Sequence, residues 1–392
     1  MDAMDELFYE IPYVREFDAQ VLSCEKGKKG WEVRLDVSAF YPEGGGQLAD
    51  GGTIGEANVT DVRRVGGEVV HYTDSPVEAG AAHCVVDWQK RFDHMQAHSG
   101  EHIVSGLIHK KFGYDNVGFH MAPDKVTVDF NGVITEEELA EIESEANAYI
   151  YANVPVRVTF PSAEELAALD YRSKKELSGK VRIVEFPEAD MCACCGTHVV
   201  RSGEVGLIKF TSMAHYKSGV RIEMLCGRLA MLDYDRKNAQ QQELCRMFSA
   251  KPYELADAVK KYAAESEAKD ARIAAMAKAM LDAKAAGYPD GASLVIDIEE
   301  GFKNAELRKF CDGLVTSGKA KVAAVLTASA AQGKSGYSYV ICSREVNLRD
   351  ASKALNKALN GRGGGDPTLV QGSFFAPLEE IERTLEERFG AL

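Results

Sequence analysis

Residues 94–102 read HMQAHSGEH, and the rest of the chain is best interpreted around them. Within this stretch His98 and His102 stand four positions apart, so in a helix their imidazoles project from one face, a single turn apart. Such a pair is half of a metal site. Two histidines at this spacing also occur on ordinary helix faces, where they only pack, so the pair alone leaves both interpretations open.

A second cluster of candidate ligands follows at residues 190–199, which read DMCACCGTHV. Three thiols and an imidazole in one short segment are poorly explained by disulfides when no secretion signal precedes them. A shell of nitrogen and sulfur suits Zn2+, which binds imidazole at about 2.0–2.1 Å and thiolate at about 2.3 Å. The two clusters together predict Zn2+ held by His98, His102, Cys194 and His198, with Cys192 and Cys195 as alternatives to Cys194.

The composition is that of a soluble globular protein. The 392 residues are 45% hydrophobic and 27% charged, and the chain is long enough for two or three domains. Its start, MDAMDE, lacks the basic region and apolar core of a signal peptide, and apolar runs such as residues 322–331 are too short to span a bilayer. We therefore expect a cytoplasmic protein without a membrane partner, whose nine cysteines are reduced.

The charge balance disfavours extensive nucleic-acid binding, because phosphate contacts need Lys and Arg and the net charge is −14. The deficit is uneven along the chain. Residues 1–90 hold 17 acidic and 8 basic side chains, whereas residues 287–392 hold 14 and 13. Contacts with a nucleic acid are therefore expected in the later parts of the chain.

Hydrophobic periodicity and turn signals divide the chain into four predicted domains. Residues 1–90 alternate in short runs between Gly-rich turns, which predicts a small β-barrel. Residues 91–230 mix helical spacing with short strands, and Thr135 with Glu138 has the form of a helix capping box. Residues 231–286 predict two long helices in a hairpin, and residues 287–392 alternate strands and helices as in a small α/β domain. The predicted fold class is multidomain α+β.

Two glycine-rich segments are candidate binding elements. Residues 40–52 read FYPEGGGQLADGG, where three glycines allow positive φ and close backbone approach, although a tight barrel corner has the same composition. Residues 360–367 read NGRGGGDP and follow a helix, unlike a phosphate-binding P-loop, which follows a strand. Arg362, Gly363 and Gly364 are candidates for contacting an RNA backbone, and a flexible loop is the alternative.

These motifs together resemble those of freestanding alanyl-tRNA editing proteins of the AlaX type, related to the editing half of alanyl-tRNA synthetases. Residues 40–47 are similar to the family's FYxExGGQ stretch, residues 98–102 to its HxxxH, and residues 194–198 to its CGGTH. Residues 218–223 resemble the segment that closes the editing domain, and residues 361–365 the glycine loop of the synthetase C-terminal domain. The sequence departs from the family at two places. Cys195 stands where the family usually has glycine, and Ser99, Gly100 and Glu101 stand between the two histidines where the family commonly has Thr-Ala-Thr.

The resemblance implies a zinc-containing editing domain at residues 91–230 and a trans-editing hydrolase, an aminoacyl-tRNA deacylase. Its substrate would be alanine tRNA mischarged with serine, with glycine as the second candidate. Gln47, Ser99 and Thr197 are the implied catalytic polar groups. Four protein ligands usually mark a structural zinc, so catalysis would require a fifth position or release of one ligand. A homodimer through the C-terminal domain is one candidate arrangement, and the sequence leaves the oligomeric state open.

Three other functions compete with this one. Residues 98–102 match the His-x-x-Glu-His arrangement of inverted zinc peptidases, in which the glutamate is the general base, but that class adds a carboxylate ligand and leaves residues 194–198 without a role. A phosphoesterase of the Asp-His-His type is disfavoured because residues 93–95 read DHM. A non-catalytic, zinc-containing tRNA-binding protein is separable from the enzyme by assay alone.

Overall fold

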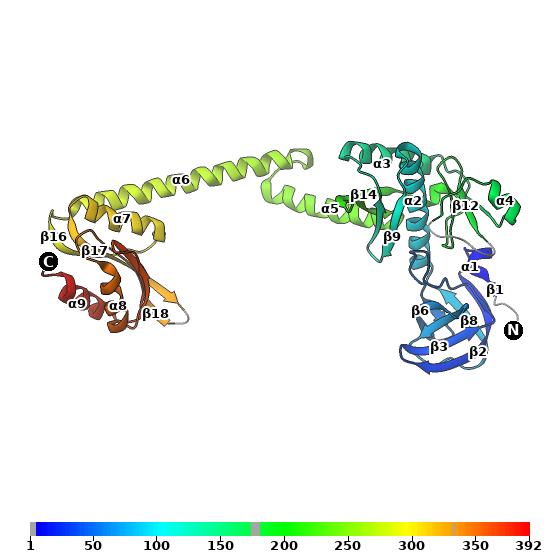
Figure 1. The fold of residues 1–392 in the computed structure, drawn as a ribbon, viewed down its shortest axis with the longest axis horizontal. Helices are drawn as coiled ribbons and strands as arrows, with labels where there is room; N and C mark the ends of the chain where they lie inside the picture. Colours follow the sequence, from blue (N-terminus) through cyan, green and yellow to red (C-terminus); the bar gives the residue numbers. More distant parts are fainter. Residues whose placement is uncertain (1–4, 174–180, 332–333) are drawn as a thin grey trace. The chain divides into compact units, whose positions relative to one another are not determined.

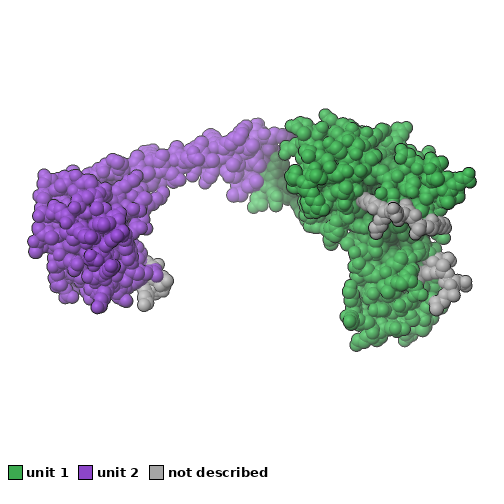
Figure 2. Space-filling model, viewed as in Figure 1, with its two compact units in different colours: residues 1–243 green, residues 244–392 purple. Residues whose placement is uncertain are grey.

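The computed structural model describes residues 5–173, 181–331 and 334–392; residues 1–4, at the acidic start of the chain, lie outside this description. The chain divides into two compact units, Met1–Glu243 and Leu244–Leu392 (Figure 2). The first unit contains both candidate metal-binding motifs and the second contains the segment around Arg362. Among the described helices, none combines the length and the apolar character needed to cross a bilayer.

A closed six-stranded barrel opens the first unit, with the strand order β2-β3-β7-β6-β5-β8 (Figure 1). The strands are β2 (Glu16–Gly27), β3 (Gly30–Leu35), β5 (Gly52–Ile54), β6 (Ala57–Val65), β7 (Glu68–Thr73) and β8 (Gly80–Val86). Along β2, Phe17, Ala19 and Val21 are buried while the residues between them are exposed, because successive side chains of a strand point to opposite faces. The small β-barrel predicted from the sequence is confirmed.

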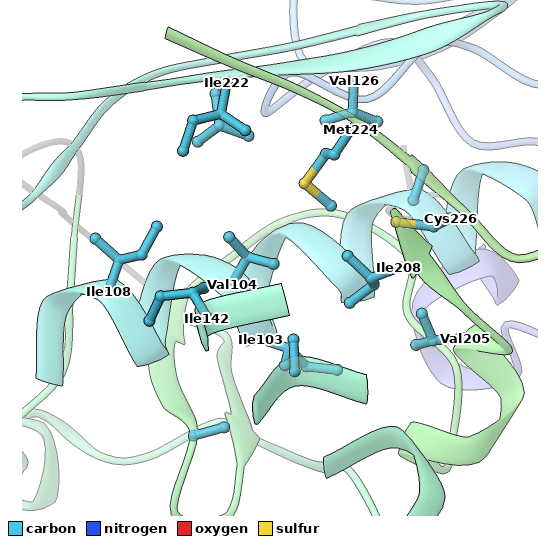
Figure 3. Close-up of a cluster of buried hydrophobic side chains, with 14 of the residues drawn as sticks. Ile103, Val104, Ile108, Val126, Ile142, Val205, Ile208, Ile222, Met224 and Cys226 are labelled. Atoms are coloured by element: carbon cyan, nitrogen blue, oxygen red, sulfur yellow. The ribbon is translucent and has the colours of Figure 1, made fainter. Parts of the chain in front are cut away.

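A four-stranded antiparallel sheet and two helices form the centre of the first unit. The sheet order is β14-β15-β10-β9, with β9 (Asn116–Ala122), β10 (Lys125–Phe130), β14 (Ile208–Tyr216) and β15 (Gly219–Cys226). Helices α2 (Trp88–Phe112) and α3 (Glu136–Tyr151) pack against it. Figure 3 shows Ile103 and Val104 of α2 within one apolar cluster that includes Ile142 of α3 and Met224 of β15. This packing sets the rotation of α2 about its axis and therefore the direction of its histidines.

Local sequence signals place the ends of these helices. The Asp87 side chain accepts a hydrogen bond from the Lys90 amide (3.1 Å) at the start of α2, and Gly113 ends the helix with φ of 71°. The predicted capping box of Thr135 and Glu138 is present at the start of α3. Both helices therefore begin, and α2 also ends, where short-range chemistry favours it.

The cysteine cluster follows a small antiparallel sheet of β11 (Arg157–Thr159), β12 (Ile183–Phe186) and β13 (Asp190–Ala193). Strand β13 lies close to α2. At Gly106 of α2 a Cβ atom would collide with the Ala189 carbonyl oxygen and lie 2.6 Å from the Asp190 side chain. The absence of a side chain at Gly106 therefore lets the two candidate ligand segments approach each other.

The second unit contains a mixed five-stranded sheet in the order β16-β17-β18-β20-β19. Its elements are α6 (Leu255–Gly287), β16 (Ala292–Ile298), α7 (Asn304–Thr316), β17 (Ala320–Ala331), β18 (Lys334–Ser343), α8 (Leu348–Ala358), β19 (Arg362–Gly365), β20 (Leu369–Phe374) and α9 (Leu378–Phe389). Alternate residues of β17 pack against α7 on one face and against α8 and α9 on the other. An α/β arrangement was predicted here, and the strand and helix order agrees with it.

Two features differ from the sequence-based expectation or go beyond it. Residues 362–365 were expected in a turn or flexible loop, but they form the edge strand β19, paired with β20, because glycine does not prevent backbone pairing. The two predicted long helices are present as α5 (Gly227–Phe248) and α6, but α5 lies mainly in the first unit and α6 in the second. Their pairing in a hairpin and the boundaries of the four domains remain predictions.

Candidate metal centre

Four side chains from two segments meet inside the first unit. The candidate ligand atoms of His98, His102, Cys194 and His198 all lie within 4.8 Å of one another, and all four residues are buried. The first two come from one face of α2, and the other two from the segment that follows β13. The structure therefore brings together the two clusters that are widely separated in sequence.

The spacing of these atoms fits a tetrahedral zinc site. The Cys194 Sγ lies 3.4 Å from His98 Nε2 and 3.3 Å from His198 Nε2. A tetrahedral ion with ordinary zinc–nitrogen and zinc–sulfur distances holds such ligand pairs about 3.5 Å apart. The donor set of three imidazoles and one thiolate is also one that zinc prefers.

Each imidazole is oriented by a hydrogen bond at its other nitrogen. His98 Nδ1 lies 2.9 Å from Gln47 Oε1, His102 Nδ1 lies 2.8 Å from Asp190 Oδ2, and His198 Nδ1 lies 3.2 Å from Ser99 Oγ. Gln47 Oε1 also accepts the Thr197 amide N–H at 3.0 Å, so the nearby His98 nitrogen carries the proton. These contacts leave the Nε2 atoms free to face a metal.

Asp190 is the acidic group that supports the centre. It is 8% exposed and accepts two hydrogen bonds from Arg172, at 2.6 and 2.9 Å, in addition to its contact with His102. Burial alone would raise the pKa of this carboxyl, but His102 and Arg172 outweigh it and the pKa is lowered. Asp190 is therefore ionised, which favours a proton on His102 Nδ1 rather than on Nε2.

The three neighbouring thiols differ in how easily they become thiolates. Burial raises the pKa of Cys194, but His98, His198 and His102 around it lower that pKa well below its usual value. Burial raises the pKa of Cys192. Partial desolvation and the neighbouring Cys194 thiolate raise the pKa of Cys195, although this residue is partly exposed to solvent. Metals bind the thiolate form, so geometry and charge both favour Cys194 as the sulfur ligand.

The predicted catalytic polar groups are buried beside the candidate ligands. Gln47, Ser99 and Thr197 have no exposed surface, and their hydrogen bonds run to His98, His198 and one another. Gln47 and Ser99 each contact the Nδ1 of one candidate ligand, and Thr197 holds Gln47, while their catalytic role stays a prediction. Their arrangement is that of positioning residues.

The segment carrying Gln47 is held by the barrel and by α2. The fully buried Arg91 of α2 donates from Nε to both carboxylate oxygens of Asp50, at 3.0 and 2.8 Å, and Asp50 also accepts the Tyr41 amide N–H at 2.6 Å. Gly45 and Gly46 have φ of 60° and 86°, in the left-handed region that other residues seldom adopt. The predicted close approach of this glycine run is found at Gly46, where a Cβ atom would collide with Phe119.

A cavity of about 390 Å3 opens onto the candidate ligands. Its lining includes Gly46, His98, Glu101, His102, Phe119, Arg172 and Cys194. Glu101 lies within it with an oxygen 3.9 Å from His102 Nε2, while its other oxygen accepts hydrogen bonds from Ser105 (2.7 Å) and Asn116. A small ligand in this cavity would therefore meet the candidate metal site, the carboxylate of Glu101 and the aromatic ring of Phe119.

Sequence reasoning missed the residues that support the ligands. Asp190 and Arg172 were not singled out, although a carboxylate four positions before Cys194 is a usable signal for a metal-supporting group. The pair of Asp50 and Arg91 was also missed, and no local pattern connects those two positions. Such partners become recognisable when the tertiary structure shows what they contact.

Comparison with known proteins agrees with this architecture. Residues 181–242 match the family described as the threonyl and alanyl tRNA synthetase second additional domain. The chain is 28% identical to alanyl-tRNA editing protein AlaX-L of Pyrococcus horikoshii, with 96% of each chain covered. It is 35% identical to alanyl-tRNA editing protein Aarsd1 of Danio rerio over 50% of this chain and 52% of that protein. The C-Ala domain of Aquifex aeolicus alanyl-tRNA synthetase is 28% identical over 26% of this chain and 94% of that one, with a TM-score of 0.21.

The matched domain is one described for threonyl and alanyl tRNA synthetases, and the relatives named above are alanyl-tRNA editing proteins. The resemblance noted in the sequence motifs is confirmed by one relative that extends over nearly the whole chain and by others that cover part of it. The chain resembles the AlaX-type alanyl-tRNA editing proteins, one of which it matches over nearly its whole length.

Proposed function

We propose that the chain hydrolyses the ester that joins a wrong amino acid to the 3′ end of alanine tRNA, with serine as the first substrate and glycine as the second. The observation that carries this proposal is the cluster of three imidazoles and a thiol, of which His98, His102 and Cys194 line the 390 Å3 cavity. An aminoacyl ester is already activated. The protein therefore needs mainly to position a water molecule and to stabilise the developing oxyanion.

In this proposal His98, His102, Cys194 and His198 hold Zn2+, which when bound supplies a Lewis acid at the substrate. Gln47 keeps the proton of His98 on Nδ1, and Asp190 does the same for His102. Ser99 accepts the Val199 amide N–H at 3.1 Å and contacts His198, so it fixes the turn that carries this ligand. These residues are proposed to position the ligands without contacting substrate.

Deacylation of alanine tRNA charged with serine, glycine or alanine tests the proposal. We expect hydrolysis of the seryl ester to be fastest, the glycyl ester to follow, and the alanyl ester to be largely spared. A zinc-loaded protein that binds this tRNA but hydrolyses none of the three esters would instead be a non-catalytic binding protein.

The peptidase alternative fits the centre less well. The third and fourth candidate ligands are Cys194 and His198, where an inverted zinc peptidase has a carboxylate. Glu101 lies close enough to His102 to be a candidate general base. One of its oxygens, however, accepts hydrogen bonds from Ser105 and Asn116. Incubation with unstructured polypeptides checks this alternative directly, and we expect no cleavage.

We also propose that the edge strand β19 contacts the tRNA backbone. Arg362 is exposed, and its guanidinium lies 5.8 Å above the Phe375 ring. The glycines that follow, Gly363 and Gly364, are exposed and add no side chain that would keep a phosphate away from the backbone amides. Replacing Arg362 with Gln is expected to weaken tRNA binding. The slope of log affinity against log salt concentration should fall by about one.

A further inference from the structure

A second cavity, of about 330 Å3, lies against the first turns of α2. It shares no lining residue with the cavity at the candidate metal centre. Its apolar wall includes Met121 of β9 and Met224 of β15, and Lys90 and His94 of α2 contribute polar groups. Small-molecule sites are typically concave and mostly apolar, with a few convergent polar groups, and begin at about this volume.

His94 is a lining residue of this cavity with a buried polar atom that lacks a hydrogen-bond partner in the described ranges of the chain. It is 6% exposed, and its Nδ1 has no hydrogen-bond partner among the described residues. A buried polar atom without a partner costs free energy, so native proteins usually complete it with a water molecule or a ligand. Burial lowers the pKa of His94 to about 4, so the neutral ring offers one donor and one acceptor near pH 7.

The other lining groups restrict the chemistry of the ligand. Leu48, Pro123 and Leu229 line the cavity with accessible apolar surface that suits a flat ring, whereas Met121 and Met224 also line it but are 1% and 0% exposed. Arg228 is engaged by Asp93 and Lys125 by Glu223, whereas Lys90 forms no ion pair within the described part of the chain. A neutral heteroaromatic ring that carries an anionic group would pack on the apolar wall, form a hydrogen bond with His94 and pair its charge with Lys90.

We propose that this cavity binds a nucleotide, with its base against the apolar wall and the polar edge of the base at His94, and with its phosphate at Lys90. Two sources supply this chemistry, a free mononucleotide and a nucleotide in the single-stranded 3′ end of a tRNA; the second source rests on the proposed function. His94 precedes His98 by one helical turn, roughly 6 Å along α2. Both cavities therefore adjoin α2, which makes the tRNA end the second source to test.

Calorimetry with the full-length, zinc-loaded protein tests the proposal. The probes are AMP, adenosine, and a tetranucleotide that copies the 3′ single strand of alanine tRNA. Saturable binding of AMP identifies a mononucleotide site, and binding of the tetranucleotide without AMP binding identifies the tRNA end. Absence of binding by AMP and the tetranucleotide at millimolar concentration would overturn the proposal, even if deacylation of tRNA proceeds normally.

Two variants locate the binding. His94→Gln should weaken whichever probe binds. Lys90→Gln should weaken that probe roughly tenfold, by the loss of one charge-assisted hydrogen bond, and leave adenosine unaffected. His120→Gln is the matched control, because His120 is exposed and neighbours Met121 on β9, where successive side chains point to opposite faces. Since Lys90 is partly exposed, its variant keeps the test valid if His94→Gln does not fold. Unchanged affinity in Lys90→Gln would place any bound nucleotide elsewhere.

Discussion

His102 is the residue at which the two halves of the candidate centre are joined, because its Nδ1 contacts Asp190 and its Nε2 faces Cys194. We expect His102→Ala to lose most of its bound zinc, since one of four donors is removed from a buried site. Elemental analysis of protein purified without added metal measures this. His109→Ala, on the exposed end of the same helix, should retain near-stoichiometric zinc, and equal retention in both variants would remove α2 from the site.

Asp190 should act on the metal through His102. Asp190→Asn keeps the shape of the side chain but removes the charge that holds the proton on His102 Nδ1, so zinc affinity is expected to fall roughly 10- to 100-fold. Competition with a chromogenic chelator measures the affinity. Asp115→Asn is the matched control, because Asp115 contacts an exposed histidine, His109, at 3.1 Å. An unchanged affinity in Asp190→Asn would leave Asp190 with a purely structural role.

A buried histidine in the barrel makes stability depend on pH. Burial lowers the pKa of His71 from 6.5 to about 4. Between these values the unfolded chain binds a proton at this position and the folded barrel does not, so stability is complete above pH 6.5 and falls as the pH drops toward 4. The expected loss between pH 7 and pH 5 is about 2 kcal/mol.

Hydrogen exchange of amides in the barrel strands measures that loss. His71→Gln should flatten the pH dependence, whereas His83→Gln, at a half-exposed histidine of the same barrel, should leave it unchanged. If both variants showed the same dependence of unfolding free energy on pH, groups other than His71 would be responsible for it.

At the scale of elements, the glycine turn before β5 decides where Gln47 lies. Gly46→Ala forces a Cβ atom into Phe119, whereas a Cβ at Gly45 meets nothing within 4 Å. We therefore expect Gly46→Ala to displace Gln47 from His98, to weaken zinc binding and thereby to lower the deacylation rate. Gly45→Ala shares the positive φ but not the collision, so its effect should be smaller. Equal activity in the two variants would show that Gln47 does not depend on this turn.

For the whole molecule, the division into two units separates the candidate chemistry from the candidate RNA contacts. A chain ending at Ala250, after α5, should keep its zinc and its rate at saturating tRNA but bind tRNA more weakly and with less salt dependence. Deacylation rates at limiting and at saturating tRNA separate the two effects. If the shortened chain were equally fast at limiting tRNA, the second unit would have another role, and sedimentation of the full chain would then test the predicted homodimer.

Short-range patterns in the sequence determined the elements and the identity of the candidate ligands. The alternation in β2, the capping box at Thr135 and the four-residue spacing of His98 and His102 all follow from the geometry of a single strand or helix. The chemistry of imidazole and thiolate then indicates zinc. These inferences need no knowledge of what lies beside each element.

The tertiary structure decided which groups support the ligands. Asp190 approaches His102 because Gly106 lets α2 pack closely on β13, and Gln47 reaches His98 because Arg91 and Asp50 join the barrel to the helix. The strand pairing of residues 362–365 likewise depends on β20, which is a separate segment. Contacts between distant segments are set by packing and by the burial of paired charges, and neither leaves a periodic signal in the sequence.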